Sequence, residues 1–339
     1  MLGISGGNIN SVAGSCCAGT LGALVHDLKG KQYVLSTNTV LARASVTPGR
    51  FHALVGEKII QPGLVETQCA KDPSTTIANL TRWVPLRFGL HNSNTVDGAI
   101  ASLLPGMVDP DGYIFNIGPI SANTIPQKQL QIGHYVQKMG RTSCLTEGQI
   151  DAIDATAKVA YGNSECHTYA SGHATFYHQI LIFPVGAFAE FGNGSDSGSM
   201  VLTEESCPRA IGMVFAAAGS LTLVNPIDLV LKALKVALVN GCTNEGGPPP
   251  SEHGLATTEA TRALSESIEQ VRMVKDRHEG ALLKLDNVAA TAIGPGDHDG
   301  QAAMLVLLKK DTRESRAQIP TQIEGVPVKI IESGEFSAM

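Results

Sequence analysis

The run Gly194-Ser195-Asp196-Ser197-Gly198-Ser199 is the segment of this chain best suited to nucleophilic chemistry. A serine between small residues can lie on a tight turn that points its own N–H and a neighbouring N–H at one spot, which stabilises the oxyanion of acyl transfer. The following Ser199-Met200-Val201-Leu202 predicts a strand that anchors such a turn. A plain hairpin turn is the alternative for a Ser/Gly-rich loop. We expect Ser197 to be the nucleophile and the N–H groups of Ser195, Asp196 and Ser197 to form an oxyanion hole.

A serine nucleophile needs a neighbouring base, and no spacing rule places an imidazole beside Ser197. Seven histidines precede the C-terminal part of the chain: His26, His52, His91, His134, His167, His173 and His178. We leave open that one of these histidines acts as the base for Ser197. The alternative is that they face solvent or have structural roles. Cys166, His167, His173 and His178 are also close in sequence, but a zinc site usually needs about four preorganised ligands. We therefore predict no metal and no cofactor.

The composition of the chain limits the classes of partner that it is expected to bind. The chain has 339 residues, of which 43% are hydrophobic and 17% charged, so it can bury a sizeable core in more than one domain. Its net charge of -6 comes without acidic or basic blocks, which speaks against nucleic acid and anionic membranes as partners. A peptide or protein is the partner we expect, and a homo-oligomer is a further hypothesis.

Several features of the sequence indicate the cellular location of the protein. The segment Met1–Asn8 has neither the basic start nor the apolar core of a signal peptide, and the apolar run at 211–218 is too short to span a bilayer. The cysteines are scattered and odd in number: Cys16, Cys17, Cys69, Cys144, Cys166, Cys207 and Cys242. We read them as free buried thiols in a reducing cytoplasm, with redox chemistry at the Cys16-Cys17 pair as the alternative.

Residues 1–243 show the pattern of many short strands. Short apolar runs are cut by Gly, Asn, Asp and Pro, as in an all-β barrel or sandwich. The expected strands cover residues 20–25, 33–36, 98–104, 135–140, 179–183, 199–202 and 210–215. Residues 226–239 predict a helix, because their apolar side chains recur on one face.

A Gly/Pro-rich linker at 244–254 separates this part from residues 255–339. Helical spacing covers 257–285, and strands are expected at 288–293, 302–308 and 326–331. We therefore expect a small α+β domain of its own rather than an extension of the barrel.

Several segments, in order, resemble those of trypsin-like serine proteases of the chymotrypsin fold. They are Ala18–Val25, Tyr33–Ala42, Val96–Ala101, Lys138–Ser143 and the Ser197 loop. Three further segments narrow the resemblance to the plant narrow-leaf proteins and their microbial trypsin-like relatives: Gln61–Gly63, Gly140–Thr142 and Leu145–Gly148. The resemblance covers roughly residues 1–239 and implies a double β-barrel with a cleft between the barrels.

The same resemblance assigns roles to three residues in the order His, Asp, Ser. Thr39 stands where the histidine belongs, Asp97 where the orienting carboxylate belongs, and Ser197 at the nucleophile. A hydroxyl cannot act as a base near neutral pH. Ser195 replaces the family's leading glycine, and its side chain is expected to hinder the backbone conformation that aims one oxyanion donor.

The resemblance also implies a primary pocket, made by Phe191, Gly192, Phe215, Ala216 and Ala217. No acid or base stands at its expected floor, so an uncharged or apolar side chain fits best. The function we predict is that of a catalytically impaired protease homologue that binds peptides or proteins in the cleft, or regulates an active relative. The alternatives are an active serine endopeptidase, with an unorthodox base or with Thr39 as a substitution in an active enzyme, and a purely structural assembly protein.

Overall fold

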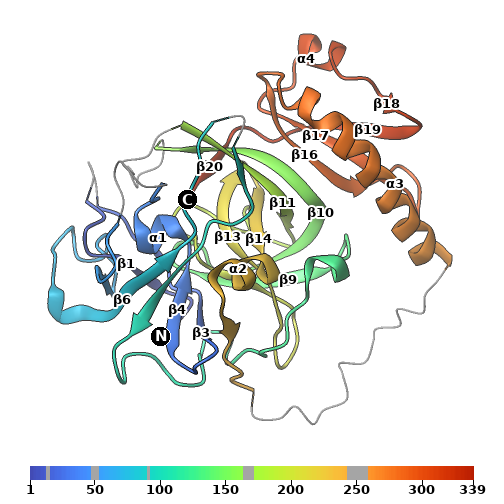
Figure 1. Cartoon of the computed structure of the whole chain (residues 1–339). Coiled ribbons are helices and arrows are strands. Elements are labelled where there is room, and N and C mark those ends of the chain that lie inside the picture. The colour runs from blue at the N-terminus through green and yellow to red at the C-terminus, as the bar shows by residue number, and fades with distance from the viewer. Residues whose placement is uncertain (13–15, 47–52, 90–91, 163–171, 243–258) are drawn as a thin grey trace.

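The computed structural model describes residues 1–12, 16–46, 53–89, 92–162, 172–242 and 259–339. Figure 1 shows two β-rich lobes side by side, with a unit that carries a long helix on the flank of the second lobe. The expected fold class is confirmed: the chain is mostly β, with two barrel-like sheets of the chymotrypsin-like arrangement followed by an α+β unit.

The first barrel is an eight-stranded sheet with the order β15-β3-β4-β8-β6-β5-β1-β2. Its strands are β1 (Ser5–Asn8), β2 (Gly19–Thr20), β3 (Ala23–His26), β4 (Gln32–Ser36), β5 (Lys58–Ile60), β6 (Thr76–Trp83), β8 (Ala99–Leu103) and β15 (Ala237–Leu238). Leu24, Val34 and Ile100 from its central strands are buried in one core. The short helix α1 (Asn38–Ala42) follows β4, and Thr37 caps it by accepting a hydrogen bond from the Val40 N–H. A 3-10 turn, η1 (Pro73–Thr75), precedes β6.

The second barrel lies between the first barrel and the C-terminal unit. Its strands are β9 (Tyr135–Gly140), β10 (Cys144–Tyr161), β11 (Gly172–Pro184), β12 (Met200–Leu202), β13 (Ala210–Ala218) and β14 (Leu221–Pro226), with β7 (Ser93–Asn94) at the edge of β11. The 3-10 turn η2 (Gln127–Gln129) precedes β9, and the helix α2 (Ile227–Leu234) follows β14. The two long strands β10 and β11 pair along most of their length, with register shifts between Ile150 and Ala157.

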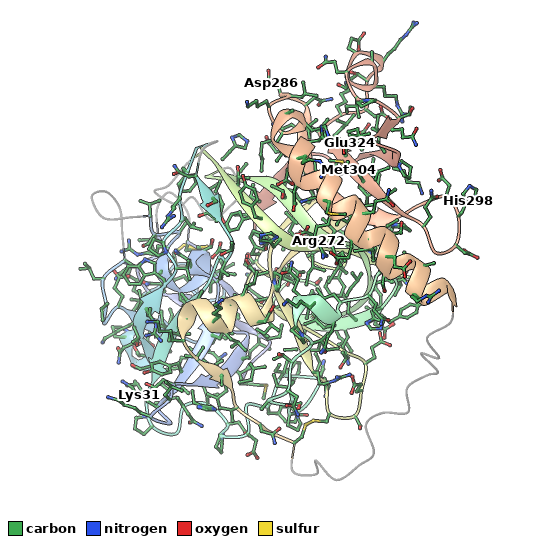
Figure 2. All side chains as sticks on the ribbon, turned by 45° about the vertical axis from the view of Figure 1, so that its right-hand side comes forward. Lys31, Arg272, Asp286, His298, Met304 and Glu324 are labelled. Atoms are coloured by element: carbon green, nitrogen blue, oxygen red, sulfur yellow. A yellow bond between two sulfur atoms is a disulfide. The ribbon has the colours of Figure 1, made fainter. Side chains whose placement is uncertain are left out.

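The C-terminal unit contains one long helix packed on strands. Its elements are α3 (Glu259–Leu282), β16 (Val288–Pro295), β17 (Ala302–Leu308), α4 (Arg313–Ala317), β18 (Gln322–Ile323) and β19 (Val326–Glu332). Figure 2 labels Met304, which is fully buried beneath α3, and three exposed residues on the outside of the unit: Asp286, His298 and Glu324. Among the described residues, no helix is both long and apolar enough to cross a bilayer.

The expectation that this unit does not extend the barrel is wrong. The strand β16 pairs antiparallel with β10, with Ile153 opposite Ile293 and Thr156 opposite Thr291, so one sheet runs through both units. The physical reason is that β10 is 18 residues long, and its second half has an edge that β9 does not reach. The predicted linker 244–254 lies outside the described residues.

The last strand returns to the second barrel. β20 (Phe336–Ala338) pairs parallel with β10 and antiparallel with β13, where Ala338 lies opposite Ala216 and Ser337 opposite Ala217. The red end of the ribbon in Figure 1 accordingly runs back from the C-terminal unit into the lobe that holds β13. The strand therefore closes the space between two strands that are otherwise not neighbours.

The cysteine prediction is also wrong. Cys16 is bonded to Cys69 and Cys207 to Cys242, and Cys17 is disulfide-bonded as well. Cys144 is an exposed thiol rather than a buried one. The paired cysteines are 53 and 35 residues apart, so only the fold brings their sulfurs together.

Candidate functional site

The Ser197 loop is held rigidly at the contact between the barrels. The Thr20 N–H of the first barrel donates to the Ser197 carbonyl oxygen at 2.9 Å. Gly198 has φ +95°, and a Cβ there would lie 2.1 Å from Ser36 Oγ and 2.2 Å from the Thr20 carbonyl oxygen. Only glycine fits this position without displacing the neighbouring barrel.

The Ser197 hydroxyl faces a peptide carbonyl. Ser197 is fully buried, and its Oγ donates to the carbonyl oxygen of Phe215 at 3.1 Å. A peptide carbonyl cannot take a proton near neutral pH, so this contact orients the hydroxyl without activating it.

The next residue in the loop, Asp196, has a structural role. Its carboxylate pairs with Lys138 Nζ at 3.3 Å, and both side chains are fully buried. It also accepts the Thr142 N–H at 2.8 Å and the Ser143 Oγ–H at 2.5 Å. Burial lowers the pKa of Lys138, and the Asp196 charge opposes that shift. The pair fixes the base of the loop from inside the second barrel.

The three N–H groups expected to form an oxyanion hole differ in their contacts. The Asp196 N–H donates to the Asn193 carbonyl oxygen at 2.9 Å, so in this structure it already has an acceptor. Within the described residues, the N–H groups of Ser195 and Ser197 donate to no protein acceptor. Ser195 has φ 70°, in the left-handed region that the glycine would adopt, so the loop keeps this conformation at an energetic cost.

Asp97 lies in a network of neutral donors. Its Oδ2 accepts hydrogen bonds from Thr39 Oγ1 and from Tyr161 OH, both at 2.9 Å. Its Oδ1 accepts the N–H groups of Asn38 at 2.6 Å and Thr39 at 3.4 Å, which start α1. The Asp97 N–H donates to Asn225 Oδ1 at 3.0 Å, which ties this loop to β14. Asp97 therefore caps α1 and contacts no cationic side chain among the described residues.

Burial dominates the electrostatics of this cluster. Complete burial raises the pKa of Asp97, and the hydrogen bonds from Tyr161, Thr39 and the α1 backbone counteract that shift. Burial beside Asp97 also raises the pKa of Tyr161 well above its ordinary value, so Tyr161 stays a proton donor. Two hydroxyl groups thus donate to the same carboxylate oxygen, Oδ2, and neither hydroxyl is a base near neutral pH.

No imidazole of the described residues hydrogen-bonds to Ser197. His26 contacts the Asp27 carbonyl oxygen, His173 contacts Glu335, and His178 contacts Asp154. His52, His91 and His167 lie outside the described residues, as does Cys166. Among the residues that the structure places, no cluster of His, Cys, Asp or Glu has the geometry of a metal site.

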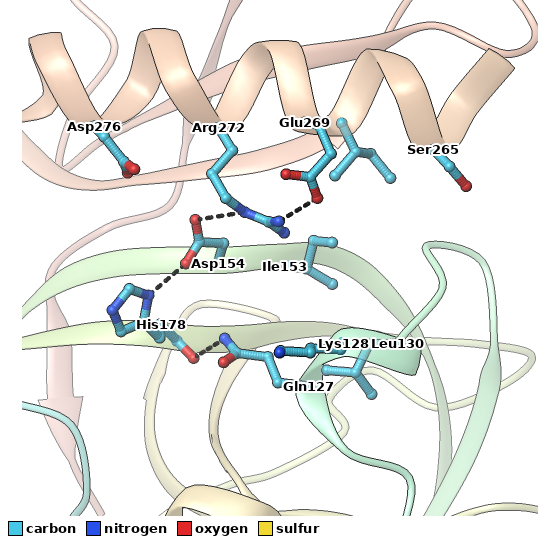
Figure 3. Close-up of a pocket in the computed structure, with 11 residues that line it drawn as sticks. Gln127, Lys128, Leu130, Ile153, Asp154, His178, Ser265, Glu269, Arg272 and Asp276 are labelled. Atoms are coloured by element: carbon cyan, nitrogen blue, oxygen red, sulfur yellow. Dashed lines mark hydrogen bonds and ion pairs between the residues drawn. The ribbon is translucent and has the colours of Figure 1, made fainter. Parts of the chain in front are cut away.

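The Asp–His pair found in the structure lies in another groove. Figure 3 shows this groove of about 530 Å³ between α3 and the second barrel, where Asp154 contacts both His178 and Arg272. His178 Nδ1 is 2.7 Å from Asp154 Oδ1, and this hydrogen bond raises the pKa of His178. The ion pairs of Asp154 hold α3 against the barrel, and among the described residues no contact links this Asp–His pair to Ser197.

The residues expected to line a primary pocket lie close to Met339. Met339 Cε lies 3.5 Å from the position that a Cβ on Gly192 would take, and Thr222 lines the same space. The Gly192 N–H donates to Thr222 Oγ1 at 3.1 Å. Phe191, which was predicted to line the pocket, is fully buried in the same core cluster as Met339. The other predicted lining residues, Phe215, Ala216 and Ala217, lie on β13 opposite the last residues of the chain.

Sequence reasoning missed several residues of this site. Tyr161, Lys138, Asn225 and Met339 all contact it, but they come from four distant segments. A lysine inside the apolar strand Tyr135–Gly140 was a usable signal, because a buried cation needs a nearby carboxylate. Nothing in the sequence around Met339 indicated that this segment returns to β13.

No protein-family model matches the chain, and no curated protein sequence matches it. Several solved structures of bacterial serine proteases are similar to it. A glutamic acid-specific serine protease that uses a histidine triad in substrate binding shares 15% identity over 70% of this chain and 98% of that chain, with a TM-score of 0.43. Thermobifida fusca protease A shares 16% identity over 71% and 98%, with a TM-score of 0.43. The Nocardiopsis protease shares 14% identity over 70% and 97%, also with a TM-score of 0.43.

Proposed function

We propose that this chain is a catalytically impaired homologue of trypsin-like serine proteases that binds a peptide or protein segment along β13. In this proposal Thr39 takes the position of the general base, and Ser197 is a nucleophile that has no base as a hydrogen-bond partner among the residues that the structure describes. The observation that carries the proposal is the Thr39 Oγ1 to Asp97 Oδ2 hydrogen bond of 2.9 Å, which uses the carboxylate that an imidazole would otherwise contact.

The Ser197 contacts support the same proposal. Its hydroxyl donates to the Phe215 carbonyl oxygen, while two backbone donors of the loop stay free of protein acceptors. Loss of a triad member typically lowers turnover by a factor on the order of 10⁴ to 10⁶, which leaves little activity for a protease. Binding along a strand edge does not need the base, so it survives the loss.

The experiment that tests the impairment measures whether Ser197 contributes to peptide cleavage. The full chain and its Ser197→Ala variant are incubated with a mixture of apolar-rich peptides, and cleavage products are counted by mass spectrometry. We expect the two proteins to give the same background. Cleavage by the full chain that the Ser197→Ala variant lacks would contradict the proposal.

The alternative is an active serine endopeptidase, either with an unorthodox base or with Thr39 as a substitution in an active enzyme. It is supported by the rigid Ser197 loop and by its two free N–H donors. The Thr39→His variant separates the two forms. Turnover only after this substitution means that the rest of the site is intact, whereas turnover before it means that another group acts as base.

Two finer predictions belong with this proposal. The narrower resemblance to the plant narrow-leaf proteins rests on short segments and stays a prediction. The cytoplasmic location also stays a prediction, and the disulfides at Cys16, Cys17 and Cys207 argue against it, because such bonds persist mainly in oxidising compartments. Thiol titration with and without reductant on protein taken directly from its source would decide between the two locations.

A further inference from the structure

The strand edge assigned to peptide binding already carries a peptide segment of this chain. β20 lies opposite β13 with Ala338 facing Ala216 and Ser337 facing Ala217. The Met339 N–H continues the ladder by donating to the Phe215 carbonyl oxygen at 3.2 Å. Backbone pairing of this kind is how an extended peptide adds to a sheet edge.

The same carbonyl oxygen links the segment to the nucleophile. The Phe215 oxygen accepts both the Met339 N–H and the Ser197 hydroxyl, so the two donors lie on one acceptor. The backbone of Met339 is therefore next to Ser197, at the point where a bound peptide would meet the loop.

The side chain of Met339 fills the apolar pocket. It is 7% exposed, packs in the core cluster that includes Phe191, and ends beside Gly192. An unbranched, flexible side chain can fill an irregular apolar space, here beside Gly192, which has no Cβ. Ala338 and Ser337 before it are small residues of the strand that lies between β10 and β13.

Two further contacts hold the segment in place. Phe336 is fully buried in the core cluster that contains Tyr161 and Ala216. Glu335 just before it pairs with Lys309 Nζ at 2.7 Å and with His173 Nε2 at 3.0 Å. These bonds connect the segment to the C-terminal unit on one side and to β11 on the other.

We propose that residues 336–339 are a built-in ligand that closes the peptide-binding edge of β13, anchored by Met339 in the pocket at Gly192. This inference rests on the proposed peptide-binding function and adds its regulation and ligand class. A partner in trans must displace the segment, and it shares the segment's chemistry: an extended peptide with a methionine-like, unbranched apolar residue in the pocket and small residues before it. When residues 336–339 occupy β13 of their own molecule, they compete with an added peptide. The apparent affinity for that peptide then falls in proportion to the fraction of molecules in which the segment is released.

The test uses three full chains: the unmodified protein, Met339→Asp and the matched control Met339→Leu. Aspartate puts an unpaired charge in an apolar pocket and releases the segment, whereas leucine keeps the pocket filled. The probe is a fluorescein-labelled peptide with the sequence of residues 332–339, and anisotropy measures its binding. We expect Met339→Asp to bind it at least about tenfold more tightly than the other two proteins do. A peptide with aspartate in the last place should not bind.

Amide hydrogen exchange of residues 336–339 measures whether each variant has released the segment. Faster exchange in Met339→Asp than in Met339→Leu is expected, and equal protection would overturn Met339 as the anchor. Equal peptide binding by all three proteins would overturn the closure while leaving the proposed function intact. Released amides in Met339→Asp without any peptide binding would overturn the proposed function itself, because the open edge then takes no peptide.

Discussion

Two aspartates of the site, Asp97 and Asp196, are both fully buried, yet they are stabilised in different ways. Asp97 receives hydrogen bonds from Thr39, Tyr161 and the start of α1, all of them neutral groups. Asp196 receives backbone and hydroxyl donors too, but it also pairs with the buried Lys138 ammonium. The Asp97 carboxylate is therefore stabilised by neutral hydrogen-bond donors, whereas the negative charge of Asp196 is compensated by the Lys138 ammonium.

The difference shows which half of the site is preserved. The Asp196–Lys138 pair fixes the loop that presents Ser197, and this half keeps the features of a nucleophile turn. Around Asp97 the place of a cationic or imidazole partner is taken by hydroxyl groups, which satisfy the carboxylate without providing a base. Under the proposed function, the second barrel keeps the nucleophile turn, and the carboxylate on the first barrel has hydroxyl partners in place of an imidazole.

The largest expected effect comes from breaking the charged pair. Lys138→Met leaves the Asp196 carboxylate buried without a cation, which costs about 3–5 kcal/mol of unfolding free energy. Chemical denaturation measures the loss. The double variant Lys138→Met with Asp196→Asn removes both charges and should recover part of that loss. A change below about 1 kcal/mol in the single variant would mean that the pair does not hold the loop.

A smaller loss is expected at Asp97. Thr39→Val removes one of the two side-chain donors to a buried carboxylate and keeps the shape, so we expect a loss of about 1–3 kcal/mol in the same measurement. Thr39→Ser keeps the hydroxyl and serves as the matched control. Equal stability of the valine and serine variants would show that the Thr39 hydrogen bond does not stabilise Asp97.

A gain is expected in the loop beside Asp196. Ser195 has φ 70°, which costs an L-residue more than it costs glycine. Ser195→Gly should raise the unfolding free energy by about 0.5–1 kcal/mol after the larger chain entropy of glycine is counted. Ser195→Ala, which keeps a Cβ, should give no such gain. A loss on substitution by glycine would refute the strain at this position.

The third buried carboxylate, Asp154, sharpens the comparison, because its partner His178 titrates. The Asp154 hydrogen bond raises the pKa of His178 above the ordinary 6.5, so its stabilising contribution is fully present below pH 6.5 and is lost as the pH rises through the raised pKa. Half exposure and solvent screening keep this contribution below about 1 kcal/mol.

Unfolding measured across this pH range checks the prediction with His178→Gln as the reference. The stability difference between the unmodified protein and this variant should shrink above pH 6.5. A difference that stays constant with pH would mean that the imidazole is not charged by its contact with Asp154.

Local patterns predicted most of the elements. Apolar runs with turn residues between them located β4, β9 and β12 closely, and helical spacing located α3. The helix predicted over 226–239 was too long, because α2 ends at Leu234 and residues 237–238 form the strand β15. The long strand β10 was missed because polar residues such as Asp154 and Lys158 interrupt its pattern. Both are paired or bonded to the C-terminal unit, through Arg272 and the Leu283 carbonyl oxygen, so their burial depends on partners far away in sequence.

Only those parts of the candidate site that lie within one short segment could be predicted from the sequence. The Ser197 turn follows from local sequence, and so does the absence of histidine at position 39, whereas the pocket residues came only from the family resemblance. The contacts of Asp97 with Tyr161 and of Gly192 with Met339 join residues 64 or more positions apart, and the disulfides likewise depend on the assembled fold. Long-range pairing of this kind has no signature in a single sequence.

The central proposal is that the Ser197 hydroxyl lacks a base, as it does among the described residues, where its partner is the Phe215 carbonyl oxygen. It is tested most directly by the rate at which a fluorophosphonate probe labels Ser197 at neutral pH in the Met339→Asp protein, with Ser197→Ala in the same background as the control. The account predicts labelling no faster than the control, even though the segment is released. Rapid, stoichiometric labelling of Ser197 with Thr39 still in place would contradict it.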